Sequence, residues 1–258
     1  MQREVADLIP RSVSVSIKFT IKLNFVDGII NTHDNYYALV LYRNNTNCGF
    51  TASQSEQLLF INCLFHDNNS SAFYNYTDAL DPGGFRFSGG LLISWRVIDL
   101  PNAQNSVIIK NCTFFRNHAV SNVRNSNDTR PDFYRPRGHG GAIVVTFERV
   151  SDFTATIMDT KIIGNTANSS GAGIFISFYG NSINNKVIIK NTTFEANMCD
   201  RDGGAISVNT FQVANDNALI VEDSNFDRNK AIVGGGACSI NIQVCSKRNT
   251  LYYLNICT

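Results

Sequence analysis

The stretch Val187–Ile206 reads VIIKNTTFEANMCDRDGGAI, and its pattern decides the fold. An apolar strand runs into Asn191, then Phe194, then Asn197 three residues later, and Gly203–Gly204 opens a second apolar strand. The arrangement occurs five times, in copies that begin over Leu58–Asn68, Val107–Asn117, Ala155–Asn165, Val187–Asn197 and Leu219–Asn229. Repetition with a period of roughly 20 to 50 residues predicts a solenoid, a propeller or another array.

Each column of the aligned copies holds a residue type that suits one place in a bent strand. The third and eighth columns are apolar and should face the core, while the fourth tolerates Lys and Glu, as expected for the outer face of a strand. The fifth column is always Asn or Asp, which accept left-handed backbone angles, so the strand should bend there. The eighth column is Phe65, Phe114, Ile162, Phe194 and Phe226, and the fifth is Asn62, Asn111, Asp159, Asn191 and Asp223.

The eleventh column is Asn in every copy. Because an amide carries two donors and two acceptor lone pairs, identical amides one strand spacing apart can bond one another, and we expect a stacked ladder. Its members are Asn68, Asn117, Asn165, Asn197 and Asn229. Glycines follow, at Gly89–Gly90, Gly140–Gly141, Gly171 with Gly173, Gly203–Gly204 and Gly235–Gly236. Glycine suits a turn that needs positive φ or close contact between neighbouring coils.

The spacing favours an all-β, single-stranded right-handed parallel β-helix with about six rungs and an unfinished C-terminal rung. The ladder Asn is followed by the first Gly after 21 and 23 residues in two copies and after 6 residues in the other three, so length varies in one turn. A propeller blade needs about 40–45 residues in four antiparallel strands, which copies 32 residues apart do not reach. We assign residues 1–57 to degenerate N-terminal rungs and 58–258 to the repeats of one continuous domain.

The strings Phe-x-x-Asn and Gly-Gly-Ala-Ile resemble the repeat signature of the chlamydial polymorphic outer membrane proteins. They are also similar to the β-helix repeats of large animal extracellular proteins. The matching pieces are Phe65–Asn68 with Gly89–Leu92, Phe114–Asn117 with Gly140–Ile143, Phe194–Asn197 with Gly203–Ile206, and Phe226–Asn229 with Gly235–Ala237. The third copy departs, with Ile162 in place of Phe. The resemblance implies a pectin lyase-like β-helix at the cell surface or outside the cell, and no particular activity.

Charge and the chain ends bear on location and partners. A net charge of +1 gives no reason to expect a nucleic acid or an anionic membrane as partner, and no apolar run approaches the roughly 18 residues of a membrane-spanning helix. Met1–Pro10 lacks the pattern of a secretory signal peptide, and Tyr252–Thr258 aligns with Val107–Thr113 but stops before the aromatic column. We therefore expect a fragment, or an incomplete gene model, of a longer surface protein with neighbouring domains.

The seven cysteines include no Cys-x-x-Cys pair, which argues against a zinc ribbon. Cys63 and Cys112 share the sixth column of consecutive copies, and a strand spacing of about 4.8 Å would allow a disulfide, although two stacked thiols fit the pattern at least as well. Asn-x-Ser/Thr also recurs. With the ladder and bend positions set aside, the candidate glycosylation sites are Asn44, Asn69, Asn75, Asn127 and Asn168.

A polysaccharide lyase or hydrolase on the same scaffold is the main alternative. Gly138-His139-Gly140 matches a tripeptide of polygalacturonases, but the Asn-Thr-Asp and Asp-Asp strings that would supply acid and base do not occur. Asp200-Arg201-Asp202 is the nearest candidate for the clustered carboxylates of a calcium-dependent lyase, and a solvated, internally paired turn explains it better. We predict no catalytic, cofactor-binding or metal-binding residue.

The variable turn is the feature expected to carry function. His66–Pro82 and His118–Arg137 hold the extra residues at the same position of two successive copies, so both loops should emerge side by side, and insertions on one face are typical of a binding face. The candidate contact residues are Tyr74, Tyr76, Arg124, Arg130, Phe133, Tyr134, Arg135 and Arg137, opposite Asp67, Asp78 and Asp81. Such loops suit an unknown protein or glycan ligand, or they pair with each other and shield the solenoid. The sequence thus favours a non-enzymatic extracellular module for adhesion, recognition or structural display, without a cofactor.

Overall fold

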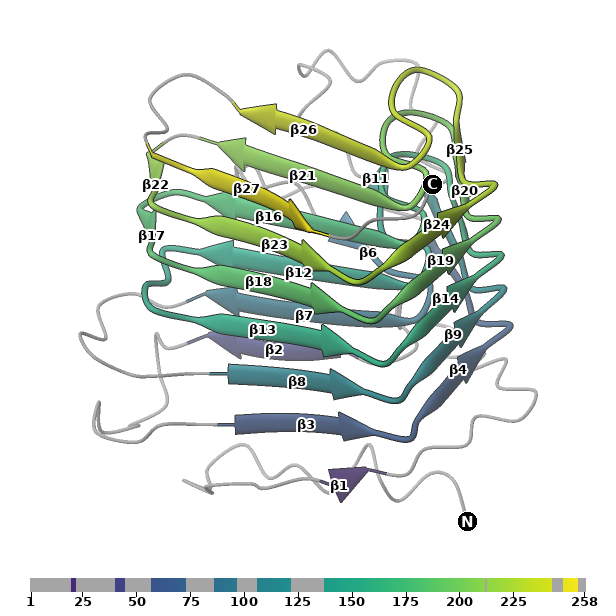
Figure 1. The fold of residues 1–258 in the computed structure, drawn as a ribbon, viewed down its shortest axis with the longest axis horizontal. Helices are drawn as coiled ribbons and strands as arrows, with labels where there is room; N and C mark the ends of the chain where they lie inside the picture. Colours follow the sequence, from purple (N-terminus) through teal and green to yellow (C-terminus); the bar gives the residue numbers. More distant parts are fainter. Residues whose placement is uncertain are drawn as a thin grey trace.

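The computed structural model describes residues 20–21, 40–44, 57–72, 86–96, 106–121, 137–211, 213–242 and 248–254. Every strand pair in these ranges is parallel, and the strands stack in layers that follow the order of the sequence (Figure 1). The described chain contains no helix. This all-β, parallel arrangement fits a β-helix-like solenoid.

Two long sheets face each other across the core. The first has the order β1-β3-β8-β13-β18-β23-β27, with bounds Thr20–Ile21, Gln57–Ile61, Ser106–Lys110, Thr154–Met158, Lys186–Lys190, Ala218–Glu222 and Thr250–Leu254. The second has the order β2-β7-β12-β16-β21-β26, with bounds Val40–Asn44, Leu91–Arg96, Ile143–Glu148, Ile174–Tyr179, Ile206–Phe211 and Cys238–Ile242. In both sheets a strand pairs with the equivalent strand of the next copy.

Shorter sheets connect the two long ones. One contains β4, β9, β14, β19 and β24, at Leu64–His66, Thr113–Phe115, Lys161–Ile163, Thr193–Glu195 and Asn225–Asp227. Another contains β5, β10, β15, β20 and β25, at Asn69–Ala72, His118–Ser121, Thr166–Ala167, Met198–Cys199 and Lys230–Ala231. Two-stranded sheets pair β6 (Arg86–Phe87) with β11 (Arg137–Gly138) and β17 (Ser182–Ile183) with β22 (Ala214–Asn215).

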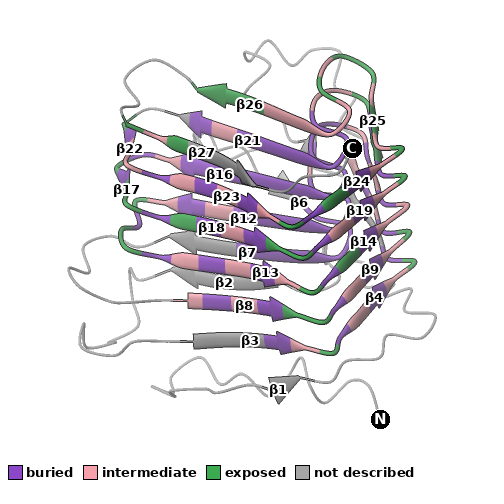
Figure 2. Ribbon diagram, viewed as in Figure 1, coloured by how far each residue is buried: buried purple, intermediate pink, exposed green. Residues whose placement is uncertain are grey.

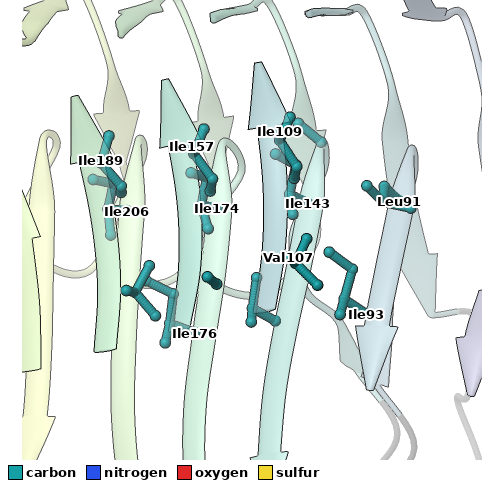
Figure 3. Packing of buried hydrophobic residues seen from close by; sticks show 14 of the residues in the cluster. Leu91, Ile93, Val107, Ile109, Ile143, Ile157, Ile174, Ile176, Ile189 and Ile206 are labelled. Atoms are coloured by element: carbon teal, nitrogen blue, oxygen red, sulfur yellow. The ribbon is translucent and has the colours of Figure 1, made fainter. Parts of the chain in front are cut away.

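The predicted inward columns form the core. All five residues of the eighth column are at most 5% exposed, and the rings of this column stack, with centroids 4.6 Å apart for Phe65–Phe114 and 4.7 Å apart for Phe194–Phe226. Burial alternates along β8, β13 and β18 (Figure 2), and aliphatic side chains from the two long sheets fill the space between them (Figure 3). The prediction for these columns is confirmed.

The bend predicted at the fifth column is also confirmed. Its five Asn and Asp residues have φ between 44° and 56°, in the left-handed region where short polar side chains are best tolerated. A second bend that the repeat pattern did not reveal lies further along each later copy, with positive φ at Asp152, Asn184, Asp216 and Arg248. The chain therefore turns at fixed places in every copy.

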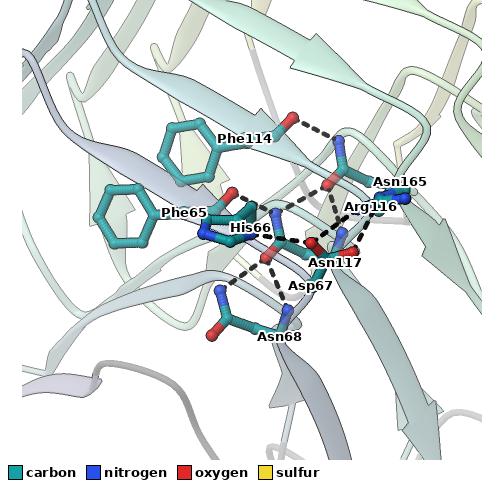
Figure 4. Close-up of polar contacts among 8 residues, drawn as sticks. All are labelled: Phe65, His66, Asp67, Asn68, Phe114, Arg116, Asn117 and Asn165. Atoms are coloured by element: carbon teal, nitrogen blue, oxygen red, sulfur yellow. Dashed lines mark hydrogen bonds and ion pairs between the residues drawn. The ribbon is translucent and has the colours of Figure 1, made fainter. Parts of the chain in front are cut away.

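The Asn ladder runs as predicted through the buried corner between β4-type and β5-type strands (Figure 4). Asn68 Nδ2 donates to Asn117 Oδ1 at 2.7 Å, and Asn117 Nδ2 donates to Asn165 Oδ1 at 2.9 Å. The same contact continues from Asn165 to Asn197 at 3.0 Å and from Asn197 to Asn229 at 2.9 Å. Each amide thus links two neighbouring copies.

A second ladder of the same kind was missed from the sequence. Asn185 Nδ2 donates to Asn217 Oδ1 at 2.9 Å, and Asn217 Nδ2 donates to Asn249 Oδ1 at 3.3 Å. The signal was present, because these asparagines are separated by 32 residues, as the last copies are. They were overlooked because no aromatic residue three positions earlier marks them.

The glycine alignment of the first copy needs a correction. Leu91 pairs with Ile143, so Gly89 stands beside Gly141, and Ser88 takes the place of Gly140. The hydroxyl of Ser88 donates to the Gly140 carbonyl at 3.0 Å. The predicted match of Gly89–Gly90 to Gly140–Gly141 is therefore wrong by one residue, because a serine occupies the first glycine position in that copy.

We expect Gly203→Ala to lower the free energy of unfolding by about 2–3 kcal/mol, because the residue has positive φ and an added Cβ would lie 2.1 Å from the Ile206 carbonyl oxygen. Gly164→Ala is the matched control. Its φ is also positive, but its nearest contact would be 3.7 Å away, and Ala196 occupies the equivalent position of the next copy. Chemical denaturation of both variants measures the difference; equal losses would contradict the role of the Ile206 contact.

Candidate recognition site at the base of the two long insertions

The two insertions leave the stack from neighbouring strands and return through neighbouring strands. Asn69–Ala72 pairs in parallel with His118–Ser121 before the insertions, and Arg86–Phe87 pairs with Arg137–Gly138 after them. Residues of β5 and β10 also contact β11. The roots of both insertions therefore lie side by side at one place on the stack.

The predicted loop boundaries need narrowing. His66 belongs to β4 and His118 belongs to β10, so both are part of the stack. The His66 ring lies 2.8 Å from Asp67 Oδ2, and Arg116 Nε lies 2.8 Å from Asp67 Oδ1. These contacts lower the pKa of Asp67, with the His66 hydrogen bond as the largest cause and Arg116 as a further one. Asp67 thus joins two copies and does not belong to a loop.

Most of the remaining candidate contact residues fall outside the residues that the structure describes. Those outside the described residues are Tyr74, Tyr76, Arg124, Arg130, Phe133, Tyr134 and Arg135, together with the candidate glycosylation sites Asn75 and Asn127. Arg137 opens β11 and pairs with Arg86 through the backbone. Asn44 ends β2 and Asn69 begins β5. The structure thus fixes the roots of the insertions and the backbone of one candidate contact residue.

The third copy clamps the returning strand of the second insertion. Gly138 N donates to Asn168 Oδ1 at 3.1 Å, and Ser169 N donates to Gly138 O at 3.0 Å. A side chain at position 138 would have no room, since its Cβ would lie 2.3 Å from the Ala119 carbonyl oxygen. Asn168, a candidate glycosylation site, is partly exposed and uses its amide oxygen in this clamp.

His118 is a titratable residue at the start of β10, one of the root strands. It lies beside Thr166 in the next copy and shares a hydrogen bond between its Nδ1 and Thr166 Oγ1. Partial burial lowers the pKa of His118, and the charge of Asp200 opposes that shift. A neutral imidazole at neutral pH suits a structural contact within the sheet.

His139, the residue considered for catalysis, packs against an aromatic ring. Its ring centroid lies 4.0 Å from that of Phe175. Phe175 forms a small buried cluster with Leu92 and Val144, separate from the main core. His139 directly precedes Gly140, which has a φ of 60° and begins the glycine turn of the second copy.

The turn at Asp200–Asp202 is held by its backbone. Arg201 N donates to Ser169 O at 3.0 Å, and Gly171 N donates to the Asp202 carbonyl at 3.0 Å. Across the described ranges, no group of three or more His, Cys, Asp or Glu side chains is arranged to hold a metal ion. The two backbone bonds join this turn of the fourth copy to the third copy.

Cys63 and Cys112 stack as thiols. Cys63 N donates to Cys112 Sγ at 3.4 Å, and Cys112 Sγ lies 3.5 Å from the Phe60 carbonyl oxygen. Burial raises the pKa of Cys112 to about 12. In-register side chains stand parallel at about the strand spacing of 4.8 Å, whereas a disulfide needs Cβ atoms about 3.8 Å apart. The stacked pair, and not the disulfide, is what the structure contains.

No protein-family model, curated protein or solved structure matches this chain. No helix in the described part of the chain is long and apolar enough to cross a membrane. The resemblance of the Phe-x-x-Asn and Gly-Gly-Ala-Ile strings to surface-protein repeats therefore rests on the repeat pattern and on the parallel β-architecture.

Proposed function

We propose that this protein is a non-enzymatic, right-handed parallel β-helix of about six rungs with an unfinished C-terminal rung. It acts outside the cell or at its surface and presents two insertions to an acidic glycan or a protein partner. The repeat signature supports the kinship with surface-displayed β-helix repeats, and the layer-by-layer strand order supports the solenoid. Right-handed crossovers are the rule between parallel strands of one sheet.

One observation carries the recognition role, namely the paired roots of the insertions. Because β5 pairs with β10 and β6 pairs with β11, two long segments of different sequence start and end at the same place. Functional residues are concentrated in loops that a rigid scaffold positions. The second insertion contributes Arg124, Arg130 and Arg135, whose guanidinium groups suit carboxylate or sulfate groups.

The charges described on the body of the stack are arranged differently. Arg116 pairs with Asp67, Arg228 pairs with Glu195, and Arg248 pairs with Asp216, in each case across neighbouring copies. Such pairs join successive layers and tie each carboxylate to a guanidinium, Glu195 and Asp227 to the same one, which suits a structural role better than the acid and base of glycoside cleavage. This favours a scaffold over the alternative of a polysaccharide lyase or hydrolase.

We expect a variant with Arg124, Arg130 and Arg135 all replaced by Ser to elute from immobilised heparin at clearly lower salt than the wild type. Each arginine that binds a polyanion releases counterions from it, so the affinity falls as the salt concentration rises. The matched control replaces Arg116, Arg228 and Arg248 by Ser and loses the same charge from the body. Its elution should change less. Equal shifts in both triple variants would contradict recognition by the insertion. Cleavage of polygalacturonate by the wild type that is lost in His139→Ala would favour the enzyme instead.

A further inference from the structure

The strand bend of the fifth column lies on the outside of the stack. Its five Asn and Asp residues are all exposed, while the sixth-column residue that follows each of them is at most 2% exposed (Figure 2). The backbone is left-handed at each bend, with φ of 51° at Asn111 and 44° at Asn191. The fifth-column side chains therefore stand at an outer corner that faces solvent.

Two of these bend residues begin an Asn-x-Thr sequence. Asn111-Cys112-Thr113 belongs to the second copy and Asn191-Thr192-Thr193 belongs to the fourth. Asn-x-Ser/Thr is the acceptor sequence for N-linked glycans, which are bulky and need a place on the surface. The repeat pattern marks both asparagines as bend positions and does not tell whether the bend faces solvent; the structure shows that it does.

The threonine of each acceptor sequence lies on the same outer surface. Burial alternates along β9 and β19, so that Thr113 and Thr193 are partly exposed, whereas the adjacent Phe114 and Phe194 are fully buried. Both residues that define the acceptor sequence are thus presented outward in each of the two copies.

The amide nitrogen that would carry the sugar has two N–H groups, and the stack uses one partner for it. Asn111 Nδ2 donates to Asn62 Oδ1 at 2.6 Å, and Asn191 Nδ2 donates to Asp159 Oδ1 at 2.8 Å, in both cases between exposed side chains. Because an amide nitrogen carries two donors, one N–H can be replaced by a sugar carbon while the other continues to donate. The bend therefore tolerates the modification.

Two other Asn-x-Ser/Thr sequences with described side chains are placed differently. Asn68 is buried in the ladder and donates to Asn117. Asn168 accepts from the N–H of Gly138, and Ser170, two residues later, is 5% exposed. A glycan at Asn68 or Asn168 would have to displace contacts within the stack, and a glycan at the bend would not.

We propose that Asn111 and Asn191 are N-glycosylation sites, an inference that rests on the proposed location outside the cell. The reaction joins Nδ2 to the anomeric carbon of an oligosaccharide carried on a lipid diphosphate. The bond between that carbon and the diphosphate oxygen breaks, the lipid diphosphate leaves with the bonding electron pair, and the amide nitrogen loses one proton.

The two glycans would stand on one corner of the stack. Asn111 and Asn191 share a column two copies apart, which is roughly 10 Å at a strand spacing of about 4.8 Å. The corner joins the first long sheet to the sheet of β9 and β19, whereas the insertion roots belong to the sheet of β5 and β10. The proposed glycans are therefore attached at a different side of the stack from the insertion roots.

The test expresses the whole chain behind a secretion leader in cultured animal cells and maps glycans by mass spectrometry before and after treatment with peptide N-glycosidase. We expect glycans at Asn111 and Asn191 in the secreted, folded fraction. Thr193→Val should remove the glycan from Asn191 while the asparagine stays in place, and Thr113→Val should do the same for Asn111. The column accepts an apolar residue, since Leu64 occupies it in the first copy.

Thr192→Ser is the matched control, because it keeps the acceptor sequence and should keep the glycan. Ser224 holds the same position in the next copy, and its hydroxyl donates to a backbone carbonyl as that of Thr192 does. Circular dichroism verifies that each variant is folded.

Absence of a glycan from Asn111 or Asn191 in the folded, secreted chain would overturn the proposal for that site. Glycans at these sites that occur only in retained, aggregated chain would also overturn it, as would equal occupancy of Asn168 and Asn191 in the folded fraction. The leader brings the chain into the secretory pathway whatever its native location. The heparin experiment can use unglycosylated protein made in bacteria, so failure of recognition by the insertion and failure of the glycan sites are distinguishable.

Discussion

Phe194→Ala is expected to lower the free energy of unfolding by about 3–5 kcal/mol, one of the two largest losses we predict. The ring is fully buried and stacks on Phe226 with interplanar angle 7°, and in the preceding copy it pairs with Ile162. Truncation would leave a cavity between two layers that are fixed by their own strand pairing. The surrounding side chains therefore have little freedom to fill it.

Equilibrium unfolding in urea measures this loss, and Phe115→Ala is the matched control. Phe115 is also an aromatic residue of the same sheet, but it is only partly buried and lies under the Arg116 guanidinium, 4.5 Å from the ring centroid. Its truncation should cost about 1 kcal/mol or less. Similar losses for Phe115 and Phe194 would show that the eighth column does not carry the core.

Asn165→Asp is expected to cost about 3–5 kcal/mol or more at neutral pH, because it places an unpaired negative charge in a buried ladder. Asn165 is fully buried, and its Nδ2 donates to the carbonyl of Phe114 and to Asn197 Oδ1. The carboxylate of the variant has no N–H group to donate, so its oxygen would face the Phe114 carbonyl oxygen and Asn197 Oδ1 without a hydrogen bond. The contacts that Asn165 Oδ1 accepts from Asn117 would remain.

The loss should depend on pH. Burial raises the pKa of the new carboxyl in the folded state above its unfolded value of about 3.9. Below that value both states are protonated and the variant is least destabilised; the loss then grows as the pH rises toward the raised folded value.

Asn62→Asp is the control, since Asn62 is exposed and accepts a hydrogen bond from Asn111, at 2.6 Å. It should change stability by less than about 0.5 kcal/mol, and equally large, pH-independent losses in both variants would refute this account.

The body of the fold could be predicted because the same physical demand recurs at the same place in every copy. A bend at positive φ admits few residue types, so Asn62 and Asp159 revealed the corner. An in-register amide must find its partner in the next copy, so Asn197 and Asn229 revealed the ladder. Because the copies repeat, each of these residue patterns occurs several times in the sequence and can be recognised by comparing the copies.

The candidate site could be predicted only in outline. The insertions do not repeat, so no column analysis constrains Arg124 or Tyr134. The repeat spacing predicts where the insertions leave the stack and nothing about how their side chains are arranged. The cysteine pair differs from the insertions. Identical columns predict that Cys63 and Cys112 are neighbours at about the strand spacing, a separation that a disulfide and a stacked pair of thiols both fit, and the structure holds them as thiols. Ser88 shows that a polar residue can take a glycine position when its hydroxyl bonds the next layer.

The constant step between the later copies has a consequence for how such a chain lengthens. Asn165, Asn197 and Asn229 bond one another across 32 residues, and the same step separates Asn185 from Asn217. After a tandem duplication of one such unit, each ladder Asn would bond the equivalent Asn of the added copy. The stack would become longer by one layer. Loss or gain of a single residue within a strand would shift that strand against its neighbours in the stack, whereas the turn after the ladder Asn holds long insertions in two copies and the ladder persists. Length in this protein is therefore free to change in whole units or in that one turn.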